Sequence, residues 1–314
     1  MTKSPRRAAN DLTLMLNAVL GENRFDRGPV DVEALALEYT RNTAGAHGEY
    51  IERIVADDLD GCEGALVPGE TKPRRWGIIY DRRQNRGRRA YTVAHELGHF
   101  MVHRHLVDED PDFDGGFRCS KDAVEHGSGK DIEKEANEFA ATLLMPLDDF
   151  RRIIPANELA DLERLGRAAQ RYGVSLTAAA LRWLSYTTTR AMLISSTEGY
   201  AHWAKPSEAA LKSGRFIRTR NEMYEMPASS LAVRRVRGDE ALTGVRQAAG
   251  VWFPESVVEM CMRTDRYDFE LTLLHFDGKG PAYQALSARS WDFGQVEERC
   301  GNIVSLIDEC FAGE

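Results

Sequence analysis

Two histidines four residues apart, in the run His95-Glu96-Leu97-Gly98-His99, constrain this chain more than any other feature of its sequence. Apolar residues recur at intervals of three and four over residues 88–105, which predicts a helix with one face in a core. On such a helix both imidazoles project from one face and can bind one zinc ion, with Glu96 beside the water on the metal. The sequence therefore predicts a metal site with an adjacent base.

A second predicted helix, residues 130–144, is the best source of a third ligand. His105 has the spacing of a third histidine ligand, but Val102 stands where the chain needs glycine to turn. On the second helix Glu133 shares a face with the apolar residues, whereas Glu135 is rotated away from them. We therefore predict that Glu133 is the ligand and keep Glu135 as the alternative.

Asn137 lies one turn after Glu133 on the same face, where it can accept a hydrogen bond from a ligand imidazole and fix its tautomer. Three protein ligands leave one zinc position for water, whose pKa zinc lowers to about 7. Glu96 would take the proton as water attacks a carbonyl and deliver it to the leaving amine. These residues fit hydrolysis of a peptide bond, although no second donor to the oxyanion can be assigned.

Cys119 lies between the two helices, in a long stretch rich in glycine and aspartate, residues 108–130. A stretch of this length is either a disordered connection or a functional loop beside the site. A thiolate is a strong zinc ligand, so we hypothesise that Cys119 occupies the water position and keeps the enzyme latent until an activator moves the loop. The alternative is an incidental thiol.

Bulk properties restrict the class of protein. The length of 314 residues suits two or three packed units. No apolar run approaches the roughly 20 residues of a membrane span and no apolar segment follows the basic N-terminus, so we expect a cytoplasmic protein with no membrane partner. The 5 cysteines show no CxxC spacing, which indicates reduced thiols. A net charge of -8 gives no bulk reason to bind nucleic acid, although arginine clusters within 82–89 and 215–237 are candidates for a basic face.

Three segments with different patterns follow one another. Residues 1–150 show helix-like stretches, then short strand-like runs, then the two helices of the metal site, which predicts an α+β domain. The strand candidates in this part are residues 51–55, 64–67 and 76–80. Residues 151–188 resemble a helix-turn-helix, but the last helix offers only Arg182 as a charged side chain, so the evidence for DNA contact is weak.

Residues 189–314 have the profile of a ligand-sensing or interaction domain, with an antiparallel sheet and a closing amphipathic helix over residues 296–311. Its strand candidates are residues 192–196, 231–236, 251–253, 257–262 and 269–276.

Two runs carry a family resemblance: Ala94-His-Glu-Leu-Gly-His99, and Glu133-x-x-Ala136-Asn137-x-Phe139-Ala140-Ala141-x-Leu143-Leu144-Met145-Pro146. Over about residues 30–150 the chain resembles the ImmA/IrrE family of metallopeptidases. Members have a zincin-like peptidase domain, often followed by a helix-turn-helix-like segment and a GAF- or PAS-like domain. The resemblance implies zinc bound by His95, His99 and Glu133, with Glu96 as the catalytic residue.

The resemblance also implies a substrate, because members of this family cleave a helix-turn-helix repressor to switch on stress or mobile-element genes. A narrower resemblance, to CapP-type peptidases of anti-phage CBASS operons, rests on the domain layout and on Cys119. Those peptidases pair with a CapH-type repressor and respond to single-stranded DNA.

Two hypotheses of different classes follow. The first is a regulatory endopeptidase that cuts a partner repressor, with the C-terminal domain sensing the trigger. The second is a DNA-binding transcriptional regulator that retains a non-catalytic zinc fold. The presence of Glu96 favours the enzyme, because a purely structural zinc site does not need it. A broad housekeeping peptidase is less favoured, because the accessory domain implies control.

Overall fold

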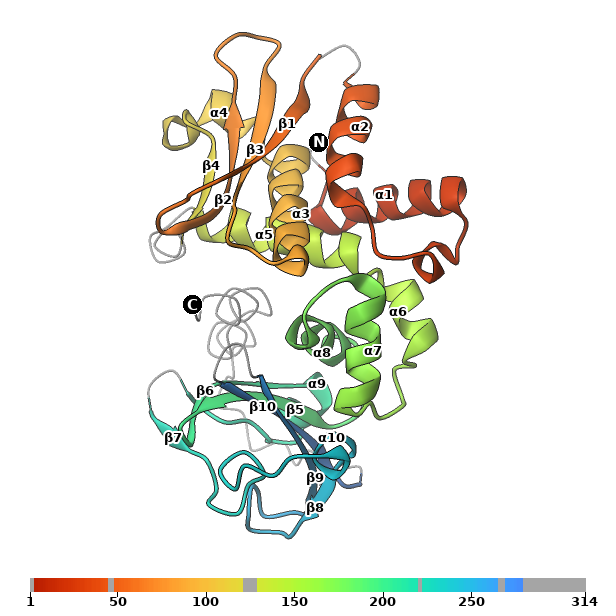
Figure 1. The fold of residues 1–314 in the computed structure, drawn as a ribbon, viewed down its shortest axis with the longest axis vertical. Coiled ribbons are helices and arrows are strands. Elements are labelled where there is room, and N and C mark those ends of the chain that lie inside the picture. The colour runs from red at the N-terminus through yellow and green to blue at the C-terminus, as the bar shows by residue number, and fades with distance from the viewer. Residues whose placement is uncertain (1–2, 45–47, 121–128, 220–221, 265–268, 279–314) are drawn as a thin grey trace, which may run out of the picture. The chain divides into compact units, whose positions relative to one another are not determined.

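The computed structural model describes residues 3–44, 48–120, 129–219, 222–264 and 269–278 (Figure 1). The chain divides into two compact units. The first comprises residues 1–147 and 170–175, and the second comprises residues 148–169 and 176–314. The boundaries predicted at residues 150 and 188 stay a prediction.

The first unit is built on a four-stranded sheet with the strand order β1-β3-β2-β4. Its strands are β1 (Tyr50–Asp57), β2 (Cys62–Pro68), β3 (Arg75–Asp81) and β4 (Phe117–Ser120). β1 and β3 are parallel, and the other neighbouring pairs are antiparallel. The first three predicted strands are confirmed, whereas β4 lies in the stretch that was expected to be either a disordered connection or a functional loop. This mixed α+β arrangement is consistent with a zincin-like domain.

The main helices of this unit are α1 (Pro5–Leu20), α2 (Val32–Thr43), α3 (Arg86–Val102) and α5 (Gly129–Leu144). The short ones are η1 (Arg24–Asp26), α4 (Leu106–Glu109) and η3 (Pro111–Phe113). The two helices predicted to bear the metal site are confirmed as α3 and α5, which cross beside the sheet (Figure 1).

Helix α3 is the centre of the first unit. Its start is fixed by Asn85, whose side chain accepts a hydrogen bond of 3.0 Å from the backbone N–H of Arg88. Every residue from Tyr91 to Phe100 is buried, because α3 packs against β2 and β3 as well as against α5. The polar side chains of the motif are therefore held in a largely dry environment.

Gly98 sets the distance between α3 and α5. A Cβ atom at this position would lie 3.1 Å from the carbonyl oxygen of Ala136 and 3.2 Å from its Cα, so the missing side chain permits the close crossing. Glu133 precedes Ala136 by about one turn of α5. The crossing therefore brings Glu133 beside the histidines of α3.

The second unit contains a six-stranded antiparallel sheet with the order β7-β6-β5-β10-β9-β8. Its strands are β5 (Ala191–Thr197), β6 (Tyr200–Pro206), β7 (Tyr224–Glu225), β8 (Val245–Gln247), β9 (Val257–Thr264) and β10 (Phe269–Phe276). Its helices include α6 (Leu147–Ile153), α9 (Glu208–Lys212) and α10 (Asp239–Thr243). The predicted strands at 192–196, 257–262 and 269–276 are confirmed as β5, β9 and β10.

Two predicted strands of this unit, residues 231–236 and 251–253, are wrong. The first segment forms turns and the second forms bends. Both are bound to Glu259 of β9, which is fully buried and accepts hydrogen bonds from the Leu231 backbone N–H (2.8 Å) and the Trp252 indole N–H (3.0 Å). Leu231, Ala232 and Trp252 are thus buried in the core of this unit without strand pairing.

The helix-turn-helix candidate consists of α7 (Leu162–Tyr172) and α8 (Leu176–Leu184). Nearly all of α8 is buried, and Arg182 is half-buried. Trp183 packs edge-on against His275 of β10, with ring centroids 5.6 Å apart. The helix that would enter a DNA groove is therefore part of the core of the second unit.

The first arginine cluster does not form an open basic face. Its ion pairs are Arg82 with Asp57, Arg83 with Asp81, Arg88 with Glu63 and Arg89 with Glu33. In the second cluster Arg215 pairs with Glu255. Acidic neighbours thus balance much of the positive charge of the first cluster and, in the second, that of Arg215.

Two further expectations concern helices. Within the described ranges, no helix combines the length and the apolar character that a membrane span requires. The amphipathic helix expected over residues 296–311 lies outside the described residues.

Candidate metal centre

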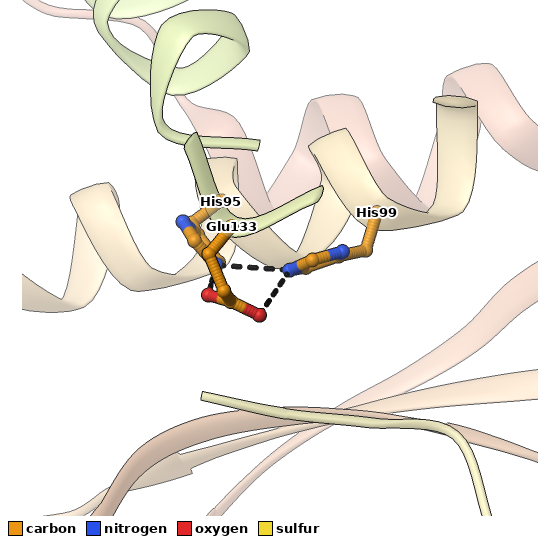
Figure 2. Close-up of side chains that lie close together, drawn as sticks. All are labelled: His95, His99 and Glu133. Atoms are coloured by element: carbon orange, nitrogen blue, oxygen red, sulfur yellow. Dashed lines mark hydrogen bonds and ion pairs between the residues drawn. The ribbon is translucent and has the colours of Figure 1, made fainter. Parts of the chain in front are cut away.

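Three side chains from two helices converge at one point, His95 and His99 of α3 and Glu133 of α5 (Figure 2). The Nε2 atoms of the two histidines are 3.0 Å apart. Glu133 places Oε2 at 3.1 Å from His95 Nε2 and Oε1 at 3.3 Å from His99 Nε2. Among the described residues, these three form the cluster whose potential metal ligands all lie within 4.8 Å of one another.

The tautomer of His95 follows from its hydrogen bond. Its Nδ1 lies 2.8 Å from Oδ1 of Asn137, which also accepts a hydrogen bond of 2.6 Å from the Tyr91 hydroxyl. An amide oxygen only accepts, so Nδ1 of His95 carries the hydrogen and Nε2 presents its lone pair to Glu133. The contact expected of Asn137 is present, and Tyr91 is a partner that the sequence did not indicate.

The electrostatics of the cluster favour a cation. Burial lowers the pKa of His99, so the protonated imidazole is disfavoured. Burial also acts to raise the pKa of Glu133, but the two imidazoles outweigh it and hold that pKa well below its usual range. An ionised carboxylate and two imidazole nitrogens therefore lie at close range, and they form a donor set for a cation when both rings present their Nε2 lone pairs.

The donor set fits zinc. Two imidazole nitrogens and one carboxylate are a common set of zinc ligands in hydrolases, with a fourth position left for water. At zinc–ligand distances of about 2.0–2.1 Å, tetrahedral ligand atoms lie roughly 3.3 Å from one another. The two imidazole nitrogens are 3.0 Å apart, and each lies 3.1 or 3.3 Å from one of the two Glu133 oxygens, so these separations approach this value.

Glu96 is fully buried and lies outside the three-residue cluster, facing β2. A Cβ atom at Gly64 of β2 would lie 2.8 Å from Glu96 Oε1. The glycine therefore provides the space that the Glu96 carboxylate occupies. The position next to a histidine ligand, on the sheet side of α3, suits a base that acts beside the metal.

We expect Gly64→Ala to destabilise the first unit. The added methyl group would lie 2.4 Å from Thr92 Cγ2 as well as against Glu96, so side chains of α3 would have to move. Overpacking of this kind typically costs about 1–3 kcal/mol. Thermal denaturation measures the effect, and Gly115→Ala is the matched control because a Cβ there meets nothing within 4 Å. Equal melting temperatures for the Gly64→Ala variant and the wild type would contradict the packing described here.

Phe117 of β4, the strand that pairs with β2, packs against His99. Its ring stacks on the imidazole of His99, with centroids 4.8 Å apart and planes inclined by 14°. This contact restricts rotation of His99. Because the sequence did not predict β4, it gave no indication of this role.

The cysteine hypothesis stays a prediction. The backbone of Cys119 lies in β4 and pairs with Gly64 of β2, but its side chain lies outside the described residues. Cys62 is described: its thiol donates a hydrogen bond of 2.8 Å to the Gly64 carbonyl, and burial raises its pKa. Cys62 is therefore a protonated thiol at neutral pH.

The other ligand candidates are not brought into the cluster. His105 is half-buried and lies outside it. Glu135 Oε2 lies 2.8 Å from His103 Nε2. Of the proposed ligand sets, the structure brings together only His95, His99 and Glu133 among the residues that it describes.

One comparison with known proteins, the match to a family model, concerns the residues of this site. Residues 53–184 match the family model of the IrrE N-terminal-like domain, peptidase family M78. No curated protein matches the chain. A solved structure, a Mycobacterium tuberculosis transcriptional regulator, is similar with 14% identity and a TM-score of 0.47, over 87% of this chain and 82% of that one. The part of the chain that bears the candidate metal centre is thus similar to the IrrE N-terminal-like domain of the M78 peptidases.

Proposed function

We propose that this protein is a zinc-dependent endopeptidase that cleaves a partner helix-turn-helix repressor and so derepresses stress or anti-phage defence genes. One observation carries the peptidase assignment: two imidazole nitrogens and a carboxylate oxygen face one point, with the Glu96 carboxylate on the next residue of α3. The IrrE N-terminal-like match supports the same assignment. The repressor as substrate is supported by the resemblance of the two motif runs to ImmA/IrrE peptidases.

The residues divide the chemistry among them. His95, His99 and Glu133 would hold zinc, which when bound polarises a carbonyl and lowers the pKa of a coordinated water. Glu96 takes the proton of the attacking water and delivers it to the leaving amine. The buried position of Glu96 keeps bulk water away from this transfer, and Asn137 keeps the Nε2 lone pair of His95 directed at the metal.

The peptidase activity would be controlled by parts of the chain other than the metal ligands and Glu96. We assign the second unit as a GAF- or PAS-like sensor whose trigger, such as single-stranded DNA, activates cleavage in the cytoplasm. A cap on the zinc by Cys119 would keep the enzyme latent in the absence of that trigger. This scheme corresponds to a CapP-type peptidase of a CBASS operon acting on a CapH-type repressor.

The second candidate function is a DNA-binding regulator with a non-catalytic zinc fold. Two observations weigh against it. The helix α8 that would read DNA is mostly buried. Glu96 is a fully buried carboxylate, which is costly to keep in a fold that has no chemical use for it.

Cleavage of a defined substrate tests the proposal. The protein is incubated with zinc and with a purified small helix-turn-helix repressor, chosen from a neighbouring gene where one is found, with and without single-stranded DNA, and the products are mapped by mass spectrometry. We expect one or a few cuts in the repressor that a chelator abolishes. An intact repressor under all these conditions, with zinc bound to the protein, would favour the non-catalytic regulator.

A further inference from the structure

A chain of three side chains runs outward from His99. Its Nδ1 lies 3.2 Å from Nδ1 of His103, the C-cap residue of α3 one turn later. The Nε2 of His103 lies 2.8 Å from Oε2 of Glu135 on α5. His103 is buried, with 3% of its surface exposed, whereas the Glu135 side chain is 45% exposed.

The acceptor at the end of this chain fixes the hydrogens. A carboxylate only accepts, so Nε2 of His103 carries a hydrogen and donates it to Glu135. The remaining ring nitrogen of a neutral His103 then accepts from Nδ1–H of His99. This leaves the lone pair of His99 on Nε2, the atom that faces Glu133.

The same geometry excludes His103 and Glu135 as ligands of the metal. His103 contacts the ring nitrogen of His99 that points away from Glu133, so it is not itself placed as a ligand. Glu135 binds His103 and stands outside the cluster of potential ligands.

We propose that His103 and Glu135 are positioning residues that hold His99 as a zinc ligand, an inference that rests on the proposed zinc peptidase function. They do for His99 what Asn137 does for His95: each imidazole receives an acceptor at Nδ1, so both Nε2 atoms are free of hydrogen and aimed at one ion. We call the hydrogen-bonded chain His99–His103–Glu135 the relay. Because Glu135 lies on α5, the relay also connects this helix to α3 independently of the metal.

Substitutions at His103 separate positioning from packing. An asparagine at 103 places its carbonyl oxygen at the same number of bonds from Cβ as Nδ1, so it can still accept from His99, whereas leucine fills the space with no acceptor. We expect His103→Leu to weaken zinc binding by about 10–100-fold, the usual cost of losing such a partner, and His103→Asn to recover most of the affinity. His105→Leu is the matched control and should bind zinc like the wild type.

A substitution of Glu135 on α5 tests whether the last residue of the relay contributes to zinc binding. Glu135→Gln removes the charge behind His103 and should weaken zinc binding by a smaller factor than His103→Leu does. Glu138→Gln, a change on the same helix at a half-buried residue that pairs with Arg6 and lies outside the cluster, should have no effect. Zinc dissociation constants come from competition with a chromophoric chelator on the full chain, and the visible spectrum of the cobalt-substituted protein reports the ligand geometry.

The outcomes are distinct. If the wild type binds zinc tightly but His103→Leu and Glu135→Gln bind it equally well, the relay is wrong and the peptidase proposal stands. If His103→Leu and His103→Asn weaken binding equally, the role of His103 is not that of an acceptor and the relay is again wrong. If the wild type binds no zinc, the proposed function itself fails.

Discussion

Replacement of Glu133 by alanine should weaken zinc binding by more than about 100-fold, beyond the 10–100-fold cost typical of losing a residue that only orients a ligand. Glu133 supplies the anionic donor of the site, and its two oxygens lie 3.1 and 3.3 Å from the histidine nitrogens. Without it, two neutral imidazoles from one helix would be left to hold a divalent ion. The measurement is a chelator competition that gives the zinc dissociation constant of the variant and the wild type.

Glu138→Ala is the matched control for this change. Glu138 lies on the same helix in an ion pair with Arg6 at the protein surface, away from the cluster. The control should bind zinc like the wild type. Wild-type affinity in the Glu133→Ala variant would show that the third ligand has been assigned to the wrong residue.

Glu96→Gln should slow cleavage by about 10²–10⁴-fold, the range that general acid–base catalysis contributes. Glutamine has nearly the same shape as glutamate and fits the buried space over Gly64, but it cannot take up the proton of the attacking water. The initial rate of repressor cleavage measures the effect. The zinc content and the melting temperature should not fall, because the three metal ligands remain in place.

The combination of results at position 96 matters more than the rate alone. A Glu96→Gln variant that cleaves at the wild-type rate would exclude Glu96 as the base. A variant that has lost its zinc would mean that Glu96 stabilises the site, in which case the lower rate would say nothing about proton transfer.

The sequence was sufficient to predict which residues meet at the site, because helical spacing is a local property. Residues four apart share a face of α3, and the apolar pattern of the second helix distinguished Glu133 from Glu135. The structure brings Glu133, and not Glu135, to the two histidines. The roles of these residues in binding and catalysis stay predictions.

The contacts around the site depend on tertiary structure, which local spacing does not encode. The stacking of Phe117 on His99 requires that β4 add to the edge of the sheet, and four residues within a glycine-rich stretch gave no periodic signal. The His103–Glu135 contact requires the close crossing of α3 and α5 at Gly98. Neither the Phe117–His99 stacking nor the His103–Glu135 contact can be predicted from the residue spacing of one helix.

The errors in the second unit have a similar origin. Residues 231–236 and 251–253 are short and rich in apolar side chains, which is typical of strands. Leu231 and Trp252 are buried instead in the hydrophobic core of this unit, and each donates a hydrogen bond to Glu259 of β9. A buried carboxylate that binds loops cannot be recognised from hydrophobic periodicity, because the pattern gives no indication of its partners.

Anomalous diffraction at the zinc absorption edge, from crystals of the full-length protein grown with zinc, tests the central claim most directly. We predict one strong peak within about 2.0–2.2 Å of His95 Nε2, His99 Nε2 and a carboxylate oxygen of Glu133. A peak bound by other residues, or the absence of any peak at these three side chains, would contradict the metal site on which the proposed peptidase depends.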